Sequence, residues 1–508
     1  MNILLLSMPN VIIAFNKACR FPSLGLSSIA GNLEGKHRVL IVDLVMLNKG
    51  DIKAFLYRMC KDFQPDIVGL SCFSFQYRTA LEIAKLIKRT NNKVITVFGG
   101  YHPTLAYKMI PEEEFQYIDF IVRNEGEKTF NKLVNLLKRD EVYDIPGISY
   151  KYEGKIIHKP PVKVLDTEEI NLPNRDVRFF KNYKAWGLKA DVAETSRGCT
   201  FNCDICSITG MYGRTFRKFS VKRIIEDLKQ MKKMGNRVIF FVDDNITLDL
   251  NHLEQVCDAI IYERLNDIHY ITQASVYGIA SSAKIVRKMA RAGFKTIFLG
   301  IENVSRKNLN FINKNTLVTE ELTVQAVRYL KENKIIVLGS VIVGNPDDTE
   351  EDIWENFRFL KRLNVDAPLI FTPTPHIGTA LRGKLIHQGY ITNPNDLTWY
   401  NGVKANIRTK FLTTEKINKL VLKMYRYYPG FKYFFTNNIL RNYPGYYIRR
   451  FFIELYEIIS DYIKVIFGKL SVDLLKRAFQ KDYERRKRWL LDDFQKKCDC
   501  CNCVYYRG

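Results

Sequence analysis

Three cysteines share one short loop in the stretch RGCTFNCDIC, residues 197–206, as Cys199, Cys203 and Cys206. The stretch follows an apolar run from Asp191 to Glu194 that predicts a buried strand. Three thiolates from one loop can bind an iron-sulfur cluster and leave one iron free for a substrate or cofactor. The alternatives are three unrelated buried cysteines and a structural zinc loop, which would lack a fourth ligand nearby.

Strand-like runs and helical patterns alternate between residues 187 and 388. This alternation predicts a partial (β/α)6 TIM barrel, whose active site lies at the carboxyl ends of its parallel strands. We expect six strands, at Asp191 to Glu194, Val238 to Val242, His269 to Gln273, Thr296 to Ile301, Ile335 to Ile342 and Ala367 to Thr374. The cysteine loop would then follow the first strand.

With this loop the sequence resembles the radical S-adenosylmethionine (SAM) superfamily, whose CxxxCxxC loop follows the first strand of a partial TIM barrel. Later motifs match in the same order, at Phe241 to Asn245, Leu299 to Glu302 and Gly339 to Pro346. The resemblance implies that Cys199, Cys203 and Cys206 hold a [4Fe-4S] cluster, which chelates SAM and cleaves it to a 5'-deoxyadenosyl radical. It also implies SAM contacts from Ile205, Asp243, Asp244, Asn245, Glu302, Gly339, Ile342 and Gly344.

Residues 1–142 alternate apolar runs with helical patterns, which predicts a doubly wound, Rossmann-like α/β domain with a parallel sheet. Ligands of such sheets bind beyond the carboxyl ends of the strands, where glycines let the backbone approach a large cofactor. These strand ends resemble the cobalamin-binding domain that is fused to many radical SAM enzymes. The resemblance implies cobalamin contacts from Ser71, Ser74, Gly99, Gly100, Thr104, Glu125 and Gly126.

The classical cobalamin motif DxHxxG supplies a histidine to cobalt, and this histidine is missing here. Asp43 is followed by Leu44-Val45-Met46-Leu47-Asn48. The pattern resembles the radical SAM branch whose cobalt lacks a histidine lower ligand, a state that would favour methyl transfer from methylcobalamin to a substrate radical. The alternative is a vestigial sheet that binds no cobalamin and only packs on the barrel.

Residues 143–186 are rich in Pro and Gly and predict a connector, and residues 389–508 predict a basic, aromatic, mostly helical C-terminal domain. The formal net charge of the chain is +24, and residues 401–508 carry 23 Lys and Arg against 10 Asp and Glu. The aromatic and basic segments there have three interpretations: helical core against the barrel, a face for anionic lipid headgroups, or a surface for a peptide or protein substrate. Nucleic-acid binding is disfavoured because no recognised motif accompanies the charge.

Four further cysteines crowd the end of the chain, at Cys498, Cys500, Cys501 and Cys503. They could bind zinc or an auxiliary iron-sulfur cluster, or form a flexible tail of reactive thiols. Their spacing is too compressed for an ordinary zinc ribbon.

The first residues, MNILLLSMPNVIIAF, lack a basic leader and predict a strand rather than a signal peptide. No run of about 18 apolar residues occurs, so we expect no transmembrane helix. The expectation is a cytoplasmic protein, with or without peripheral contact with an anionic membrane. In a reducing compartment, clustered cysteines favour metal ligation over disulfides.

As a whole, residues 1 to about 385 resemble class B, cobalamin-dependent radical SAM methyltransferases. This implies that one SAM methylates cobalamin, that a second yields the radical, and that an unactivated substrate carbon receives the methyl group. It also implies an external electron donor such as flavodoxin or ferredoxin, and a lipid, small-molecule or peptide substrate. The alternatives are an enzyme of the same architecture that catalyses cyclisation, oxidation or carbon-carbon coupling of a lipid, tetrapyrrole-like or peptide substrate, and a non-catalytic cluster-binding protein.

Overall fold

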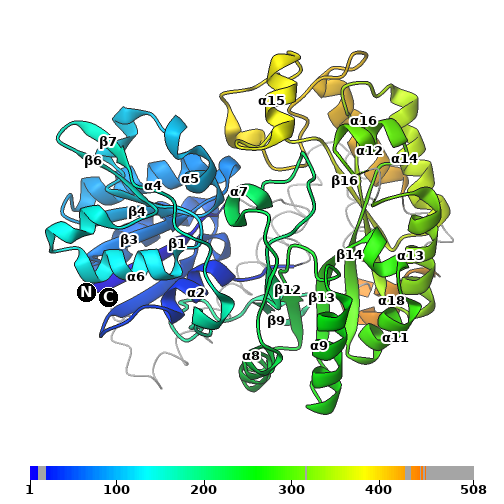
Figure 1. Ribbon diagram of the computed structural model, residues 1–508, viewed down its shortest axis with the longest axis horizontal. Helices are drawn as coiled ribbons and strands as arrows, with labels where there is room; N and C mark the ends of the chain where they lie inside the picture. The colour runs from blue at the N-terminus through cyan, green and yellow to red at the C-terminus, as the bar shows by residue number, and fades with distance from the viewer. Residues whose placement is uncertain (10–18, 315–316, 429–435, 447, 450–451, 453–508) are drawn as a thin grey trace, which may run out of the picture. The chain divides into compact units, whose positions relative to one another are not determined.

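The computed structural model describes residues 1–9, 19–314, 317–428, 436–446, 448–449 and 452. The chain divides into two compact units, residues 1–442 and residues 443–508. The described part of the first unit holds two seven-stranded sheets and a short two-stranded ribbon (Figure 1).

The N-terminal sheet has the strand order β2-β1-β3-β4-β5-β6-β7, with the first five strands parallel. Its strands are β1 (Asn2–Ser7), β2 (Arg38–Asp43), β3 (Ile67–Ser71), β4 (Ile95–Gly99), β5 (Phe120–Val122), β6 (Ile148–Tyr152) and β7 (Lys155–His158). The five parallel strands alternate with helices along the chain. This confirms the predicted doubly wound α/β domain.

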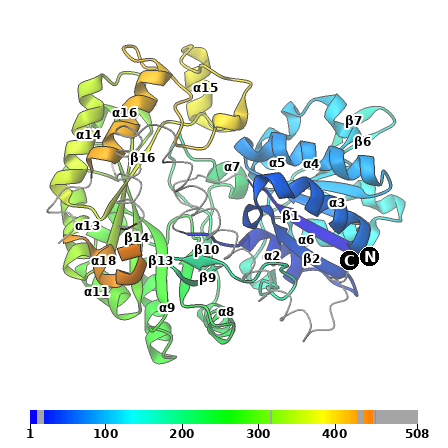
Figure 2. The ribbon, with the colours of Figure 1, turned by 180° about the vertical axis from the view of Figure 1, so that it is seen from behind.

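Helices cover both faces of this sheet (Figure 2). Successive strand residues point to opposite faces, so Leu4 packs with the helices of one face and Leu5 with those of the other. The first face carries α3 (Ile52–Phe63) and α4 (Tyr77–Thr90), and the second carries α2 (Leu24–Gly31) and α6 (Gly126–Leu136). The short α5 (Tyr101–Ala106) follows β4.

The last two strands of the sheet lie in the segment predicted as a connector. β6 and β7 form an antiparallel hairpin, and β6 pairs with β5. The turn between them consists of Glu153 and Gly154, both with positive φ, which is the conformation that two-residue hairpins require. The sheet therefore continues beyond residue 142.

The second sheet has the order β16-β15-β14-β13-β12-β9-β8, an open, curled half-barrel. Its strands are β8 (Lys184–Ala185), β9 (Leu188–Ala193), β12 (Val238–Phe241), β13 (His269–Ser275), β14 (Phe294–Glu302), β15 (Ile336–Ile342) and β16 (Ala367–Phe371). All but β8 run parallel. The six predicted barrel strands are confirmed.

Helices pack on the outside of the half-barrel and share one hydrophobic core with it. They are α8 (Val221–Lys233), α9 (Leu250–Tyr262), α10 (Val276–Ala280), α11 (Ala283–Arg291), α12 (Arg306–Phe311), α13 (Glu320–Glu332) and α14 (Glu350–Leu363). Several begin after a capping side chain, such as Ser220 before α8 and Asp249 before α9. Such local caps explain why the helix positions follow the sequence pattern.

Beyond the barrel the chain forms α15 (Ala380–His387), α16 (Thr414–Tyr427) and α18 (Asn438–Asn442). α16 is part of the barrel core, since Ile417, Leu420 and Met424 are fully buried there. This favours the core interpretation for the start of the aromatic region. In the described part of the chain, every helix is too short or too polar to cross a membrane.

Candidate active site

A two-stranded ribbon lies between the first parallel barrel strand and the cysteine loop. β10 (Ser196–Arg197) follows β9 and pairs antiparallel with β11 (Arg217–Lys218). Gly198 then turns the chain with a φ of +85°, and a Cβ atom there would lie 2.2 Å from the carbonyl oxygen of Thr215. Only glycine tolerates so close an approach, so this residue shapes the entry into the loop.

Three half-buried thiols follow before α7 (Ile208–Tyr212). Burial raises the pKa of the Cys203 thiol to about 12 and that of Cys206 to about 11, while the ammonium group of Lys314 opposes both shifts. The thiol of Cys199 also has a raised pKa because of burial. Ligation requires thiolates, so metal binding at this loop would release protons.

The positions of the three thiols along one loop fit an iron-sulfur cluster. Among the described residues, no three His, Cys, Asp or Glu side chains are grouped so that they could hold a metal ion. Zinc needs all its sulfur ligands about 2.3 Å from one point, whereas each cysteine of an iron-sulfur cluster binds a different iron. Three spaced thiols in one loop therefore fit a cluster.

An ion pair lies beside these thiols. Glu302 ends β14 with a φ of +65°, and its Oε1 atom is 2.5 Å from Lys314 Nζ. Burial lowers the pKa of the Lys314 ammonium, but Glu302 and the thiols of Cys203 and Cys206 raise it above its ordinary value. Sequence motifs point to Glu302 but not to Lys314, because only folding brings this lysine next to the loop.

The predicted segment after β12 supports the loop from the barrel side. Asp243 accepts hydrogen bonds from Thr195 Oγ1 and Ser196 Oγ, both at 2.6 Å. Asp244 accepts one from the Gly198 amide at 2.8 Å. Burial raises the pKa of each of these two carboxyl groups to about 6.

Asn245 accepts from the hydroxyl of Thr247 at 2.7 Å, within its own turn. The side chains of this segment are thus engaged in holding the loop and its neighbours.

The predicted residues on β15 and in the turn just after it pack closely in the barrel wall. A Cβ atom at Gly339 would lie 2.9 Å from Val365 Cγ1, and one at Gly344 would lie 3.2 Å from Ile417 Cγ2. The carbonyl of Ile342 accepts a hydrogen bond from Asn303 Nδ2 at 2.8 Å.

Ile205, in the cysteine loop, packs against Leu381 and Leu385 of α15. The loop is therefore fastened to the segment that follows the last barrel strand.

The predicted cobalamin residues gather at the carboxyl edge of the N-terminal sheet. Ser71 ends β3 and Gly99 ends β4, and a Cβ atom at Gly100 would lie 3.0 Å from Ser71 Oγ. Ser74 Oγ lies 3.3 Å from the ring nitrogen Nδ1 of the buried His102. This histidine is therefore engaged locally.

Two predicted residues reach the edge from further along the chain. Thr104 Oγ1 accepts from the Asn124 amide at 2.8 Å, which joins α5 to the turn after β5. Gly126 begins α6, and a Cβ atom there would touch Ile29 at 3.0 Å.

Aromatic rings at this edge were not expected from the sequence. Phe73 is 50% exposed, and its ring stacks on Phe75 at 6.1 Å and on Tyr101 at 5.4 Å between centroids. An exposed ring that stacks on its neighbours beside closely approaching backbone fits a large planar macrocycle such as a corrin. A weak signal was present, since Phe73-Ser74-Phe75 begins two residues after the end of the third strand.

Asp43, which lacks the following histidine, has a different role from that in the DxHxxG motif. It is buried and accepts a hydrogen bond from the hydroxyl of Tyr183 in the connector. Burial keeps the pKa of its carboxyl above the ordinary value. Leu44–Met46 form a single 3-10 turn behind it.

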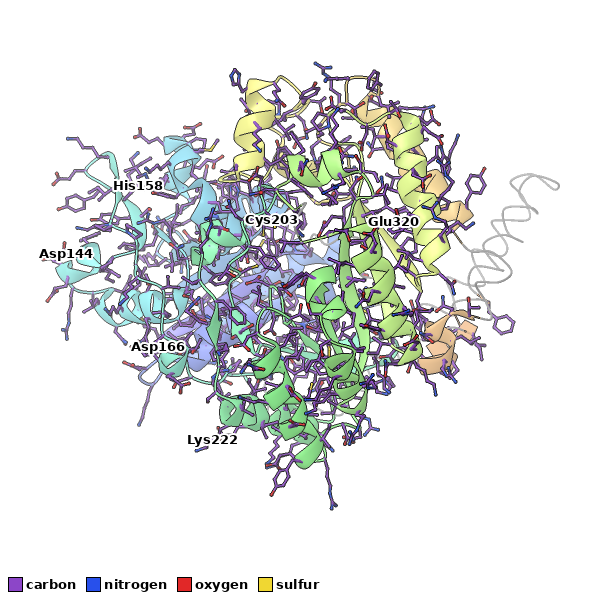
Figure 3. The ribbon with its side chains drawn as sticks, turned by 45° about the vertical axis from the view of Figure 1, so that its right-hand side comes forward. Asp144, His158, Asp166, Cys203, Lys222 and Glu320 are labelled. Carbon is purple, nitrogen blue, oxygen red and sulfur yellow. The ribbon has the colours of Figure 1, made fainter. Side chains whose placement is uncertain are left out.

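The carboxylate of Glu125 contacts the barrel rather than open space. Both of its oxygens accept from Arg217 Nη1, at 3.1 and 2.9 Å, and one also accepts from Arg197 at 2.9 Å. A second link is Asn124, whose side-chain amide donates to the carbonyl of Met211 in α7 at 2.8 Å. Cys203 of the cysteine loop is labelled in Figure 3. Any contact of Glu125 with a corrinoid would therefore come from its main chain.

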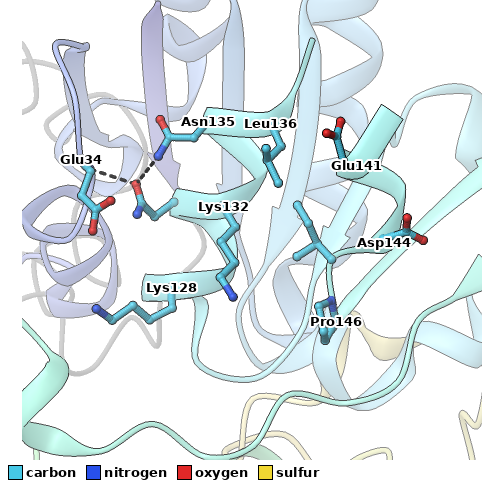
Figure 4. Close-up of a pocket in the computed structure, with 10 residues that line it drawn as sticks. Glu34, Lys128, Lys132, Asn135, Leu136, Glu141, Asp144 and Pro146 are labelled. Atoms are coloured by element: carbon cyan, nitrogen blue, oxygen red, sulfur yellow. Dashed lines mark hydrogen bonds between the residues drawn. The ribbon is translucent and has the colours of Figure 1, made fainter. Parts of the chain in front are cut away.

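One described feature lies apart from this region. A surface pocket of about 600 Å³ borders α6 and is lined by Lys128, Lys132, Asn135 and Glu141 among others (Figure 4). None of the predicted site residues lines it. Cys498, Cys500, Cys501 and Cys503 lie outside the described residues, so their metal binding stays a prediction.

Comparison with known families assigns the two halves. The sequence model of the radical SAM superfamily matches residues 193–360, and that of the B12-binding domain matches residues 12–134. An uncharacterized methyltransferase of Pyrococcus horikoshii is 34% identical over 411 residues, which cover 80% of this chain and 87% of that protein.

Two further proteins share this arrangement. The anaerobic magnesium-protoporphyrin IX monomethyl ester cyclase of Synechocystis is 26% identical, over 75% of this chain and 77% of its own. The radical SAM methyltransferase TsrM of Kitasatospora setae, solved with cobalamin and a [4Fe-4S] cluster, superposes with a TM-score of 0.63 at 18% identity, over 76% of this chain and 78% of its own. With a cluster-type cysteine loop, a half-barrel and a B12-type sheet in one chain, the protein belongs to the radical SAM superfamily, in the group that carries an N-terminal B12-binding domain.

Proposed function

We propose that the protein is a cobalamin-dependent radical SAM methyltransferase that methylates an unactivated carbon. One observation carries the proposal: the segments that flank the cysteine loop, at Arg197 and Met211, contact Glu125 and Asn124 at the carboxyl edge of the B12-type sheet. Methyl transfer to a carbon radical requires the radical-generating site and the methyl carrier to meet at one substrate, so adjacent sites suit this chemistry. The methyltransferase relative supports the same function.

The residues of the chain have distinct proposed roles. Cys199, Cys203 and Cys206 would hold the [4Fe-4S] cluster, and Lys314 would balance the negative charge of thiolates and bound SAM. When bound, the cluster supplies the electron that cleaves SAM, and cobalamin carries the methyl group. The barrel strands position the loop, while Asp244 fixes its entry through the Gly198 amide.

The proposed cofactor contacts complete the site. SAM would meet Ile205, Asp243, Asp244, Asn245, Glu302, Gly339, Ile342 and Gly344, and cobalamin would meet Ser71, Ser74, Gly99, Gly100, Thr104, Glu125 and Gly126. The exposed Phe73 and its stacked neighbours would lie against the corrin ring.

Enzymes of this superfamily need an electron donor and a substrate, and their identities here are part of the proposal. We expect flavodoxin or ferredoxin as donor and a lipid, small molecule or peptide as substrate. We propose a cytoplasmic location with peripheral contact with anionic membranes, and the basic charge of residues 401–508 supports the membrane contact.

The test is anaerobic purification from a host that takes up cobalamin, followed by an absorbance spectrum, an iron count and a corrinoid assay. We expect about four irons per chain, bound corrinoid, and 5'-deoxyadenosine from SAM after reduction. The variant with Cys199, Cys203 and Cys206 changed to Ala should lose the cluster absorbance. Retention of most of it would place the cluster elsewhere in the chain.

A second candidate is a cyclisation, oxidation or carbon-carbon coupling on the same scaffold, which the relationship to the Synechocystis cyclase favours. The two differ in whether one SAM is consumed as a methyl donor in addition to the SAM that yields the radical. A methyltransferase forms S-adenosylhomocysteine and 5'-deoxyadenosine together with a methylated product. A product without an added methyl group, formed in the presence of cobalamin, would decide for the second candidate. A chain that forms no 5'-deoxyadenosine would be a cluster-binding protein without turnover.

A further inference from the structure

Arg197 is held by carboxylates from both halves of the first unit. Its Nη1 lies 2.9 Å from Glu125 and its Nη2 lies 2.8 Å from Glu127, both at the start of α6. The same guanidinium donates to both oxygens of Glu194, at 2.8 Å each, on the barrel side. All four side chains are at least nine-tenths buried.

Arg217 holds the same carboxylate from a second direction. It is the register partner of Arg197 on the β10–β11 ribbon, and its Nη1 contacts both oxygens of Glu125. The Glu125 Oε2 atom also accepts from the Leu165 amide at 3.1 Å. We call Arg197, Arg217, Glu125, Glu127 and Glu194 the arginine clamp.

One end of the clamp reaches the cysteine loop. Arg197 directly precedes Gly198, whose amide is fixed by Asp244, and Cys199 follows. Only Gly198 separates Arg197 from Cys199, the first cysteine of the loop. A shift of the Arg197 backbone therefore displaces the ligand loop.

The other end reaches the carboxyl edge of the N-terminal sheet. Glu125 and Glu127 flank the first residue of α6, just after β5 ends at Val122. Parallel sheets bind ligands beyond this edge, and Thr104 there is bonded to the amide of Asn124. The clamp thus joins the turn that borders the corrinoid edge to the residue before the cluster loop.

We propose that Arg197 is a positioning residue that sets the separation between the corrinoid and the iron-sulfur cluster. The proposal rests on the proposed function, because it assumes that both cofactors bind. Buried ion pairs are weak evidence for stability, since apolar residues often replace them without loss. A planar guanidinium that forms paired hydrogen bonds instead fixes orientation, which a lysine cannot do.

The test compares Arg197→Lys and Glu127→Gln with Asp119→Asn, a matched control. Asp119 pairs with Lys88 at 2.6 Å, and both residues belong to the N-terminal domain. The holoenzymes are loaded with cobalamin and reduced with dithionite until the cluster and cob(II)alamin are both paramagnetic. Their magnetic interaction is then measured by electron paramagnetic resonance, alongside iron and corrinoid counts.

We expect both clamp variants to keep iron and corrinoid but to lose the single, defined magnetic interaction of the wild type. The control should keep it. A fully loaded clamp variant with the wild-type interaction overturns the proposal. Loss of a cofactor from both folded clamp variants also overturns it, because the clamp would then stabilise the fold rather than set the distance between the two cofactors.

Glu127→Gln keeps the side-chain shape, so it decides the question if Arg197→Lys does not fold. A wild-type chain that binds no corrinoid contradicts the proposed function instead. In that case the clamp is tested by hydrogen exchange of the backbone amides in residues 120–130 and 196–206. The exchange rate must rise in both segments of Glu127→Gln and in neither segment of the control. Any other result overturns the proposal.

Discussion

Changing Gly198 to Ala should remove the cluster while leaving the fold intact. The added Cβ atom would lie 2.2 Å from the carbonyl oxygen of Thr215, whereas ordinary contacts begin at 3.4 Å. The loop or the facing strand must therefore move by about 1 Å to relieve the overlap. Metal-ligand distances tolerate only about 0.2 Å, and Cys199 is the next residue, so the displacement is large for a ligand loop.

Gly235 is the matched control for the backbone cost. It has a φ of +81°, close to the +85° of Gly198, but a Cβ atom there meets no atom within 4 Å. Gly235→Ala should cost about 1 to 2 kcal/mol of stability, the price of a left-handed conformation for an L-residue. Gly198→Ala bears the same conformational cost and the steric overlap in addition.

The assay is anaerobic reconstitution with iron and sulfide, followed by iron counting and the absorbance of the cluster. Urea unfolding of the metal-free proteins measures stability separately. We expect Gly235→Ala to bind the wild-type amount of iron and Gly198→Ala to bind less than about a third of it. If Gly198→Ala binds the full amount with an unchanged spectrum, the close approach of Thr215 does not shape the ligand loop.

Two further predictions concern charges beside the two cofactor edges. Burial lowers the pKa of His102 from 6.5 to about 4, so between these values the unfolded chain binds more protons than the folded chain, and stability falls as the pH falls. Between pH 7 and pH 5 the wild type should lose about 2 kcal/mol more stability in urea unfolding than His102→Gln, in which other buried histidines such as His376 still titrate. Equal losses in both proteins would contradict the assignment. Lys314→Met should shift the midpoint potential of the cluster tens of millivolts more negative, because a nearby positive charge stabilises the reduced cluster. Redox titration measures the shift, with the exposed Lys307→Met as control, and equal potentials in both variants would exclude a role for Lys314.

The strands and the cysteine loop were predictable because their signals are local. The alternation of Leu4 and Leu5 between two faces, and the six apolar runs of the barrel, follow from short-range periodicity. The hairpin at Glu153 and Gly154 lies in a segment predicted only as a connector, because its pairing with β5 depends on a strand nearly thirty residues away. The extension of the sheet into the connector therefore depends on tertiary structure and not on local sequence.

The residues of the candidate site also divide into those that local sequence signals predict and those that only folding brings together. Cys199, Cys203 and Cys206 are recognisable because three ligands lie within one loop. Lys314 was missed because it is separated from them by more than a hundred residues and carries no motif. Glu125 was expected to face a cofactor, but folding directs its carboxylate to two arginines.

Local sequence patterns alone predicted the order of the domains, the ligand loop and the class of chemistry. Periodicity, spacing and turn residues act over a few positions, and each leaves its mark in the chain itself. Only the folded chain determines which charged side chains form ion pairs with one another. Arg197 meets Glu125, Glu127 and Glu194 because buried charges must find partners, and packing of two separate sheets determines which partners are within reach.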